Sequence, residues 1–313
     1  MSFFSIFYST VLPTLLFAYK LVDNFQSNNL LDNFDFFTED DPTHGFVNYV
    51  DRKDAEWMGM IRERNNQLYI GVEHQLQVYA GARGRNSIRI VSKKSYNKGL
   101  FILDLEHLPA GQCGSWGAFW MVGADWPNNG ELDIIEGVNT ATVNGVAMHT
   151  NEGCQIRNST NFTGQIIYSD CDVKAANQPE NVGCSIRGGP FGLAFNQQGG
   201  GIYATEWTRE YVRVWFFSHS QLPSDIRALN PQPSNWQKPL AEFTNEECDL
   251  DLHFRYQQIV FDVTFCGDWA AKVWTEDKEC EATGQTCIEY VQHNSFVFNE
   301  TYWLINSLQI YEQ

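Results

Sequence analysis

Hydrophobic residues recur along this chain in short runs that alternate with polar residues, and not at the spacing of an amphipathic helix. In the run at 211–217, Val212 and Val214 fall on one face of an extended chain, and Arg213 and Trp215 fall on the other. Similar runs, rich in β-branched and aromatic residues and bounded by Gly, Asn or Pro, lie at 67–73, 87–92, 99–108, 145–150, 258–265 and 303–312. The pattern predicts an all-β protein.

The chain shows no internal repeat, no low-complexity tract and no long amphipathic helix. A Pro-containing stretch at 223–239 also carries Trp236 and Leu240 nearby, so we interpret it as a long loop and not as a linker between domains. The simplest architecture is a β-jelly-roll sandwich of two antiparallel sheets, formed by one domain over residues 19–313.

Residues 3–18 carry no charge and end at a small residue, Ala18. The run is short for a membrane span and is typical of a secretory leader, so we predict a signal peptide at residues 1–18. The alternative is that these residues begin a buried strand. No later stretch approaches the length of a membrane span, so no membrane association is expected.

Cysteines and glycosylation sequons also indicate export. The chain has eight cysteines and no C-x-x-C pair, which favours disulfides over a zinc or redox site. Their spacing does not decide the connectivity, although Cys280 and Cys287 are close enough for a local loop. Three sequons predict N-glycans at Asn158, Asn161 and Asn299. We therefore expect a secreted, extracellular protein.

Charge and composition narrow the class of partner. The formal net charge is −17, which repels phosphate backbones and anionic membranes, so nucleic acid is excluded as an expected partner. Aromatic residues make 14% of the chain. A large core could absorb them, or some could line a groove, because sugar rings stack on aromatic side chains. A neutral polymer fits both observations.

Three acids stand among apolar residues at Glu131, Asp133 and Glu136, directly after a turn at 127–130. In a helix, Glu131 and Glu136 would lie far apart around the axis and the apolar residues would form no stripe, so a strand is favoured. A regular strand would send Glu136 to the opposite face. One extra residue at 134–135, a β-bulge, returns it to the face of the other two.

Acids arranged in this way suit retaining glycoside hydrolysis, in which one carboxylate attacks the anomeric carbon and one carboxyl protonates the leaving oxygen. Asp133, between them, can hydrogen-bond the nucleophile and bias which neighbour holds a proton. The alternative is a solvated or calcium-binding acidic edge. The seven histidines form no H-E-x-x-H pattern and no close pair, so we expect neither a catalytic metal nor a cofactor.

The segment G-E-L-D-I-I-E-G matches the E-x-D-x-x-E signature of glycoside hydrolase family 16, and the chain resembles fungal laminarinases of endo-β-1,3(4)-glucanase type. The resemblance implies a β-jelly roll with a concave substrate cleft. It also implies that Glu131 is the nucleophile, Glu136 the general acid/base and Asp133 the assisting residue. Further similar segments lie at 41–51, 84–90, 113–139, 148–150, 196–204 and 265–270.

The same resemblance implies substrate-binding residues in the cleft. Tryptophans at three positions are similar to the family's sugar-stacking residues, and three polar residues are similar to its contacts with glucose hydroxyls or to its active-site histidine. For each residue the alternative is a structural role in the core or in a loop. The six are Trp120, Trp126, Trp269, Asn48, Arg89 and His149.

The prediction is a monomeric, retaining endo-β-glucanase that binds β-glucan polysaccharide and hydrolyses β-1,3-glucan and mixed β-1,3/1,4-glucan. One alternative is a transglycosylase, which uses the same acids but passes the glycosyl unit to a sugar. Another is a non-catalytic glucan-binding protein on the same fold. Retention of all three acids argues against the binding protein.

Overall fold

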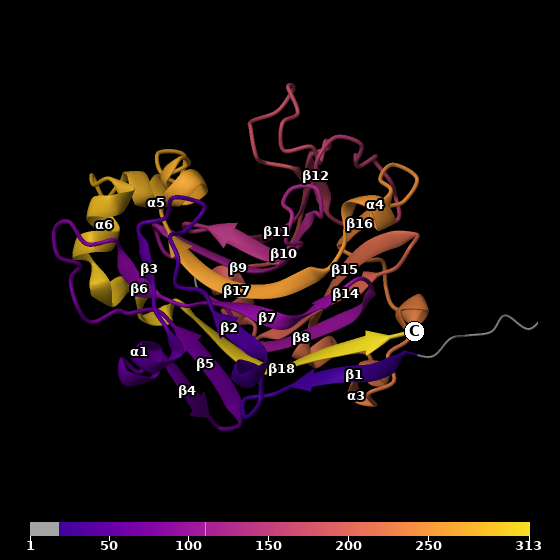
Figure 1. Cartoon of the computed structure of the whole chain (residues 1–313), viewed down its shortest axis with the longest axis horizontal. Coiled ribbons are helices and arrows are strands. Elements are labelled where there is room, and N and C mark those ends of the chain that lie inside the picture. Colours follow the sequence, from indigo (N-terminus) through magenta and orange to yellow (C-terminus); the bar gives the residue numbers. More distant parts are fainter. Residues whose placement is uncertain (1–18, 110) are drawn as a thin grey trace, which may run out of the picture.

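The computed structural model describes residues 19–109 and 111–313, which form two large antiparallel sheets packed face to face. In Figure 1 the strand β17 curves strongly, with its hollow side turned away from the second sheet. We call the sheet that contains it the concave sheet. Its strands, in spatial order, are β12 (Gln165–Tyr168), β13 (Cys184–Pro190), β11 (Val143–His149), β10 (Glu131–Val138), β9 (Ser115–Val122), β17 (Gln257–Phe265), β7 (Arg89–Tyr96) and β2 (Phe34–Phe36).

The second sheet, the outer sheet, lies below the concave one in the view of Figure 1. Its strands in order are β16 (Ala241–Thr244), β15 (Tyr211–Ser218), β14 (Gly201–Trp207), β8 (Gly99–His107), β18 (Tyr302–Glu312), β5 (Gln67–Gly71) and β4 (Ile61–Arg64), with β1 (Lys20–Phe25) also paired to β18. A small parallel pair joins β3 (Val47–Tyr49) to β6 (Arg85–Ser87). The predicted all-β sandwich is confirmed, and each run that the alternation marked lies on a strand.

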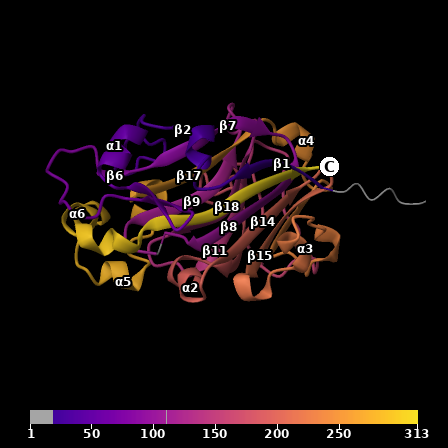
Figure 2. The same cartoon turned by 90° about the horizontal axis from the view of Figure 1, so that it is seen from below.

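Helices are short and lie at the margins of the sheets (Figure 2). The α-helices are α1 (Arg52–Trp57), α2 (Gly192–Gln197), α3 (Ser224–Arg227), α4 (Leu250–His253), α5 (Lys278–Glu281) and α6 (Cys287–His293). Single turns of other helix types are η1 (Leu30–Asn33), η2 (His219–Gln221), η3 (Pro233–Asn235), η4 (Gly267–Ala271) and η5 (Ser295–Glu300). Within the described residues, no helix has the length and apolar character needed to span a membrane.

The strand β15 shows that alternation along the chain does not by itself predict which residues are exposed. Val212 and Val214 share a face, as predicted, and that face lies against the main core between the sheets. On the other face, Trp215 is also buried, because the segment 219–240 covers it. Trp236 from that segment packs edge-on against Trp215, with ring centroids 5.2 Å apart. The stretch predicted as a plain loop therefore contains α3 and η3 and adds a second, smaller core.

All eight cysteines form disulfides, and the described residues contain no free cysteine. The pairs are Cys113–Cys280, Cys154–Cys248, Cys171–Cys184 and Cys266–Cys287. The local loop that the spacing of Cys280 and Cys287 allowed does not form, because Cys280 on α5 pairs with Cys113 before β9 and Cys287 on α6 pairs with Cys266 after β17. Two disulfides thus hold the α5–α6 segment beside the concave sheet. The predicted signal peptide at 1–18 lies outside the described residues and stays a prediction.

These cross-links make a prediction about stability. The protein, denatured without reductant, should show no reactive thiol. Replacing Cys171 and Cys184 together by Ser opens a loop of 13 residues and should lower the free energy of unfolding by about 3 kcal/mol. The matched double replacement of Cys113 and Cys280, separated by 167 residues, should lower the free energy of unfolding by a larger amount, because the loop is longer. Urea unfolding measures both, and the reverse order would contradict this account.

Candidate active site

The strand β10 carries the three predicted acids at the middle of the concave sheet, between β9 and β11. The turn before it ends at Gly130, whose φ of 73° lies in the left-handed region. A Cβ at this position would also come within 2.5 Å of the carbonyl oxygen of His253. Glycine is therefore required here, and the turn delivers Glu131 to the first position of the strand.

The predicted β-bulge is present. Along β9, Asp133 pairs with Trp120, but the next pair joins Ile135 to Phe119, so Ile134 is the extra residue. Along β11, the register also shifts between Asp133 and Glu136. The bulge therefore lies where the spacing of the acids placed it, and it returns Glu136 to the face of Glu131 and Asp133.

Two polar side chains, His149 and Trp116, contact the three acids. The His149 Nε2 atom lies 3.1 Å from an Asp133 carboxylate oxygen and 3.9 Å from one of Glu131. His149 reaches them because it pairs directly with Glu131 across β10 and β11. On the other side, the Trp116 indole N–H donates a hydrogen bond of 2.8 Å to Glu136.

Burial governs the protonation of this cluster. It raises the pKa of Glu131, Asp133 and Glu136 to about 8 each, because a carboxylate loses hydration in the sheet. The charge of Asp133 raises the pKa of both glutamates further. His149 opposes the rise at both glutamates, and Arg89 opposes it at Glu131. The three acids therefore share protons near neutral pH, which is the condition that acid/base chemistry needs.

A fourth acid, Asp262 on β17, completes the polar floor of the site. It accepts hydrogen bonds from the Trp120 indole at 2.9 Å and from the Tyr49 hydroxyl at 3.0 Å. Burial raises its pKa to about 6, and Arg89, beside it on β7, opposes that rise. The Arg89 guanidinium also lies over the Trp120 ring, 4.9 Å from its centroid. Asp262 thereby holds Trp120 beside the acids.

The structure brings some predicted binding residues to the acids but not all. Trp269 on η4 packs edge-on against Trp116, with ring centroids 5.5 Å apart. Trp126 stands in the turn before β10 and is 40% exposed. Asn48 on β3 donates to Asn86 at 2.7 Å. Within the described residues, no hydrogen bond or ring contact links either Trp126 or Asn48 to the three acids.

Sequence reasoning missed Trp116, Tyr49 and Asp262, although two signals were available. Alternation in 115–122 places Trp116 on the same face as Trp120, so both indoles had to face the same way. Asp262 is a lone acid in the otherwise apolar run 259–265, which is unusual for a residue on a buried strand. No local pattern marked Tyr49, because its contact with Asp262 joins residues far apart in the chain.

The acid cluster also has the donor set of a cation site. The ligand atoms of Glu131, Asp133 and His149 lie within 4.8 Å of one another, close enough to hold one divalent ion. Cys113, Cys280 and Asp277 are similarly close. In that second group the two sulfurs are joined in a disulfide, so they supply no thiolate.

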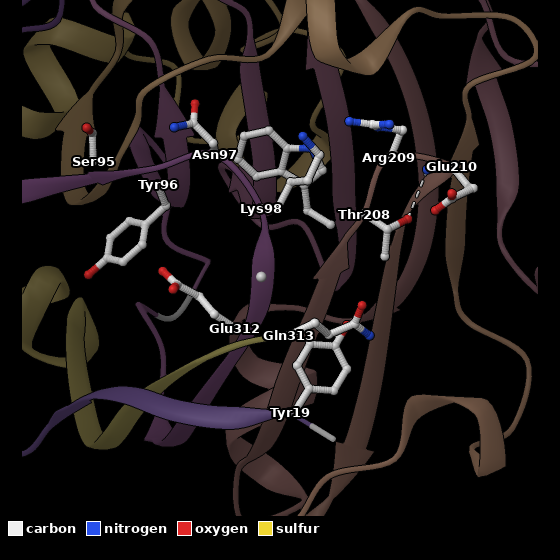
Figure 3. Close-up of a pocket in the computed structure, with 12 residues that line it drawn as sticks. Tyr19, Ser95, Tyr96, Asn97, Lys98, Thr208, Arg209, Glu210, Glu312 and Gln313 are labelled. Atoms are coloured by element: carbon white, nitrogen blue, oxygen red, sulfur yellow. Dashed lines mark hydrogen bonds between the residues drawn. The ribbon is translucent and has the colours of Figure 1, made fainter. Parts of the chain in front are cut away.

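A separate hollow lies among the ends of β1, β7, β8 and β18 and the turn after β14 (Figure 3). Its two cations, Lys98 and Arg209, both pair with Asp251. Figure 3 shows Tyr19 and Glu312 at its lower margin and Tyr96 to one side. None of the β10 acids lines it, so the candidate active site is the concave sheet and not this hollow.

Comparison with known proteins finds relatives that are described as β-glucanases or glycosidases. An endo-1,3(4)-β-glucanase of Arthroderma benhamiae is 44% identical over 95% of this chain and 65% of its own length. A probable glycosidase of Schizosaccharomyces pombe is 42% identical over 94% of this chain and 70% of its own length. A probable endo-1,3(4)-β-glucanase of Neosartorya fischeri is 38% identical, and this chain covers 46% of its length. The chain thus spans between about half and about two thirds of these relatives.

Two solved structures superpose closely, each with a TM-score of 0.87 over 94% of this chain and 100% of the other. One is an elongating family 16 β-1,3-glucosyltransferase, at 38% identity. The other is laminarinase 16A of Phanerochaete chrysosporium, at 36% identity, with 6-O-glucosyl-laminaritriose in donor and acceptor sites. The profile of the XgeA-like catalytic domain of family 16 matches residues 34–311. With this match added to the bulged carboxylate strand, the chain belongs to glycoside hydrolase family 16.

Proposed function

We propose that this protein is a secreted, retaining endo-β-glucanase that hydrolyses β-1,3-glucan and mixed β-1,3/1,4-glucan through a covalent glycosyl-enzyme. The observation that carries the proposal is the bulge in β10, which puts Glu136 on the same face of the concave sheet as Glu131 and Asp133. Two carboxyl groups with an assisting acid between them are the equipment of a retaining glycosidase.

The neighbours of the two glutamates support different roles. Arg89 opposes the effect of burial at Glu131 and so favours its ionised form, which suits this carboxylate for attack on the anomeric carbon. In the first step the glycosidic bond breaks while Glu136 donates its proton to the leaving oxygen. The Trp116 N–H then stabilises the Glu136 carboxylate. In the second step Glu136 takes a proton from water, which attacks the anomeric carbon and releases Glu131.

The surroundings of the acids support a neutral glucan as the substrate. Aromatic faces are supplied by Trp120 on β9, by Trp126 in the turn before β10 and by Trp269 on η4. The net charge of −17 disfavours an anionic polymer. Arg89 is 8% exposed, and its Nε atom has no hydrogen-bond partner within residues 19–109 and 111–313. We assign Arg89, Asn48 and His149 to contacts with glucose hydroxyls.

Transglycosylation is the second candidate, favoured by the 38% identity to a structure described as an elongating β-1,3-glucosyltransferase. Both reactions share the first step and differ in whether water or a sugar hydroxyl takes the glycosyl unit. A non-catalytic glucan binder would have no use for the arrangement of acids on β10. Analysis of product lengths at high acceptor concentration separates transfer from hydrolysis.

Export and modification belong to the same proposal. Four disulfides suit an oxidising compartment. The three sequon asparagines are all exposed, two in the segment between β11 and β12 and one in η5, so each is open to an N-glycan. We propose a monomeric, extracellular enzyme glycosylated at Asn158, Asn161 and Asn299.

The first test of the mechanism uses azide as an external nucleophile. In Glu131→Gly, azide takes the place of the missing nucleophile and should give an α-glycosyl azide from an activated β-glucosyl donor. In Glu136→Gly, azide should attack the covalent intermediate and give the β-azide, because water is no longer activated. Product stereochemistry by NMR distinguishes the two. The opposite assignment of α and β would exchange the roles of the two glutamates.

The raised pKa values also predict a pH dependence of stability. Protonated carboxyls contribute stability fully below the unfolded pKa of about 4.5, and this contribution is lost as pH rises toward 8. Glu136→Gln cannot ionise, so its stability relative to wild type should increase from pH 5 to pH 8 by about 1–3 kcal/mol in urea unfolding. As a control, Glu242 is buried but paired with Arg213. Glu242→Gln should be destabilised at both pH values.

The linkage preference is tested by initial rates on laminarin, lichenan, carboxymethylcellulose and xyloglucan. The rings of Trp116 and Trp269 stand at 90° to each other, and aromatic platforms set at an angle suit the twist of a β-1,3 chain, so laminarin should be cleaved fastest. Trp120→Ala should raise KM on laminarin several-fold without abolishing turnover, because one stacking contact contributes on the order of 1 kcal/mol. Trp57→Ala, at a tryptophan of α1 that is 85% exposed, is the matched control and should leave KM unchanged. Faster cleavage of either of the last two substrates would reject the linkage assignment.

A further inference from the structure

The bulge in β10 breaks the hydrogen-bonded ladder to β11. Asp133 pairs with Ala147, and the next pair joins Glu136 to Gly145. Two residues of β10 therefore stand opposite the single residue Val146. Such a mismatch leaves main-chain groups without their partners on the neighbouring strand. Because the strand lies in the middle of a sheet, water does not replace those partners, and the structure must satisfy the groups in another way.

One side chain fills both gaps. Asn144 on β11 is completely buried. Its Nδ2 donates to the carbonyl oxygen of Ile134 at 2.9 Å, and its Oδ1 accepts from the backbone N–H of Glu136 at 2.9 Å. A carboxamide offers a donor and an acceptor on one rigid plane. The side chain thus replaces the missing ladder bonds at the bulged residue Ile134 and at Glu136.

We propose that Asn144 is a positioning residue of the active site, whose side-chain amide holds the bulge and thereby aims Glu136 at the leaving oxygen. The inference rests on the proposed function for the role of Glu136. Asn144 does not itself reach the substrate, since it is buried behind the strand. Its effect passes through the backbone N–H of Glu136, the residue whose direction the bulge decides.

The chemistry of the amide makes the proposal specific. Alanine leaves both the Ile134 carbonyl and the Glu136 N–H unpaired. Aspartate keeps an acceptor for the N–H but presents a second oxygen to the Ile134 carbonyl, so the two repel each other while the carboxylate is ionised. Once protonated, that oxygen becomes a donor and restores the original pair of bonds. Acid should therefore repair Asn144→Asp and should not repair Asn144→Ala.

The matched control is Asn196 on α2. Its side chain makes the same kind of bidentate bridge, accepting from the Leu108 N–H at 3.0 Å and donating to the Leu108 carbonyl at 3.0 Å. It lies outside the acid cluster, on a helix between β13 and β14, and its partner Leu108 directly follows β8 of the outer sheet. Loss of this bridge should lower the free energy of unfolding for the same reason, because it leaves two backbone groups without their hydrogen bonds. It gives no reason for a change in turnover.

The kinetic experiment compares Asn144→Ala, Asn144→Asp, Asn196→Ala and Asn196→Asp with wild type on laminarin. Asn144→Ala should lower kcat on the order of 100-fold with KM within about two-fold, because a displaced proton donor affects the reaction and not binding. For Asn144→Asp, the ratio of kcat to that of wild type should rise as pH falls. The Asn196 variants should keep kcat, with a ratio that does not depend on pH.

A readout that does not use activity separates this inference from the proposed function. The Trp116 indole N–H bonds to Glu136, so its NMR cross-peak, assigned with Trp116→Phe, reports where that carboxyl lies. The peak should move in Asn144→Ala at every pH, whereas in Asn144→Asp, whose carboxyl is buried, it should move only at alkaline pH, where that carboxyl ionises, and return on acidification. It should stay in place in Asn196→Asp. An unmoved peak with unchanged kcat in Asn144→Ala would overturn the proposal. If the peak moved in Asn144→Ala but the wild-type protein cleaved no glucan, only the proposed function would be rejected.

Discussion

The site depends on one break in the alternation of a β-strand. Three acids spaced as Glu131, Asp133 and Glu136 cannot face one cleft on a regular strand, because the last would point into the core. The bulge at Ile134 resolves this conflict and keeps Leu132 and Ile135 buried between the sheets. A buried carboxylate on the core side would cost more than the bulge does. The apolar residues of β10 and its acids therefore favour the same irregular geometry.

Crowding of acids is the second constraint. Four carboxyl groups lie on β10 and β17, the two strands that flank β9 in the concave sheet, and burial raises the pKa of each of them. Like charges at such separations cannot all be ionised at once. The site answers this with shared protons, with the Arg89 guanidinium beside Asp262, and with N–H donors from two indoles. Stability is given up here so that protons are available where the chemistry needs them.

The fold and the acids could be predicted from sequence because both depend on local patterns. Alternation marked the strands, and the spacing from Glu131 to Glu136 required the bulge at 134–135. What sequence could not supply are contacts between distant residues. The disulfide partner of Cys280 is 167 residues away, and the hydroxyl of Tyr49 meets a carboxylate 213 residues along the chain. Burial of Trp215 on the outer face was likewise hidden, because it depends on where the segment 219–240 folds back.

A tryptophan in this site can make two kinds of contact, one through the face of its ring and one through its N–H. The face of an indole can stack on a sugar, while its N–H can orient a carboxylate. Trp120 presents its N–H to Asp262, and Trp116 presents its N–H to Glu136. Trp269 packs on Trp116 and stands three residues after Cys266, which is tied to α6 by a disulfide. Under the proposed function, a sugar stacked on Trp269 would be connected through Trp116 to Glu136, and one chain of contacts would set the position of both.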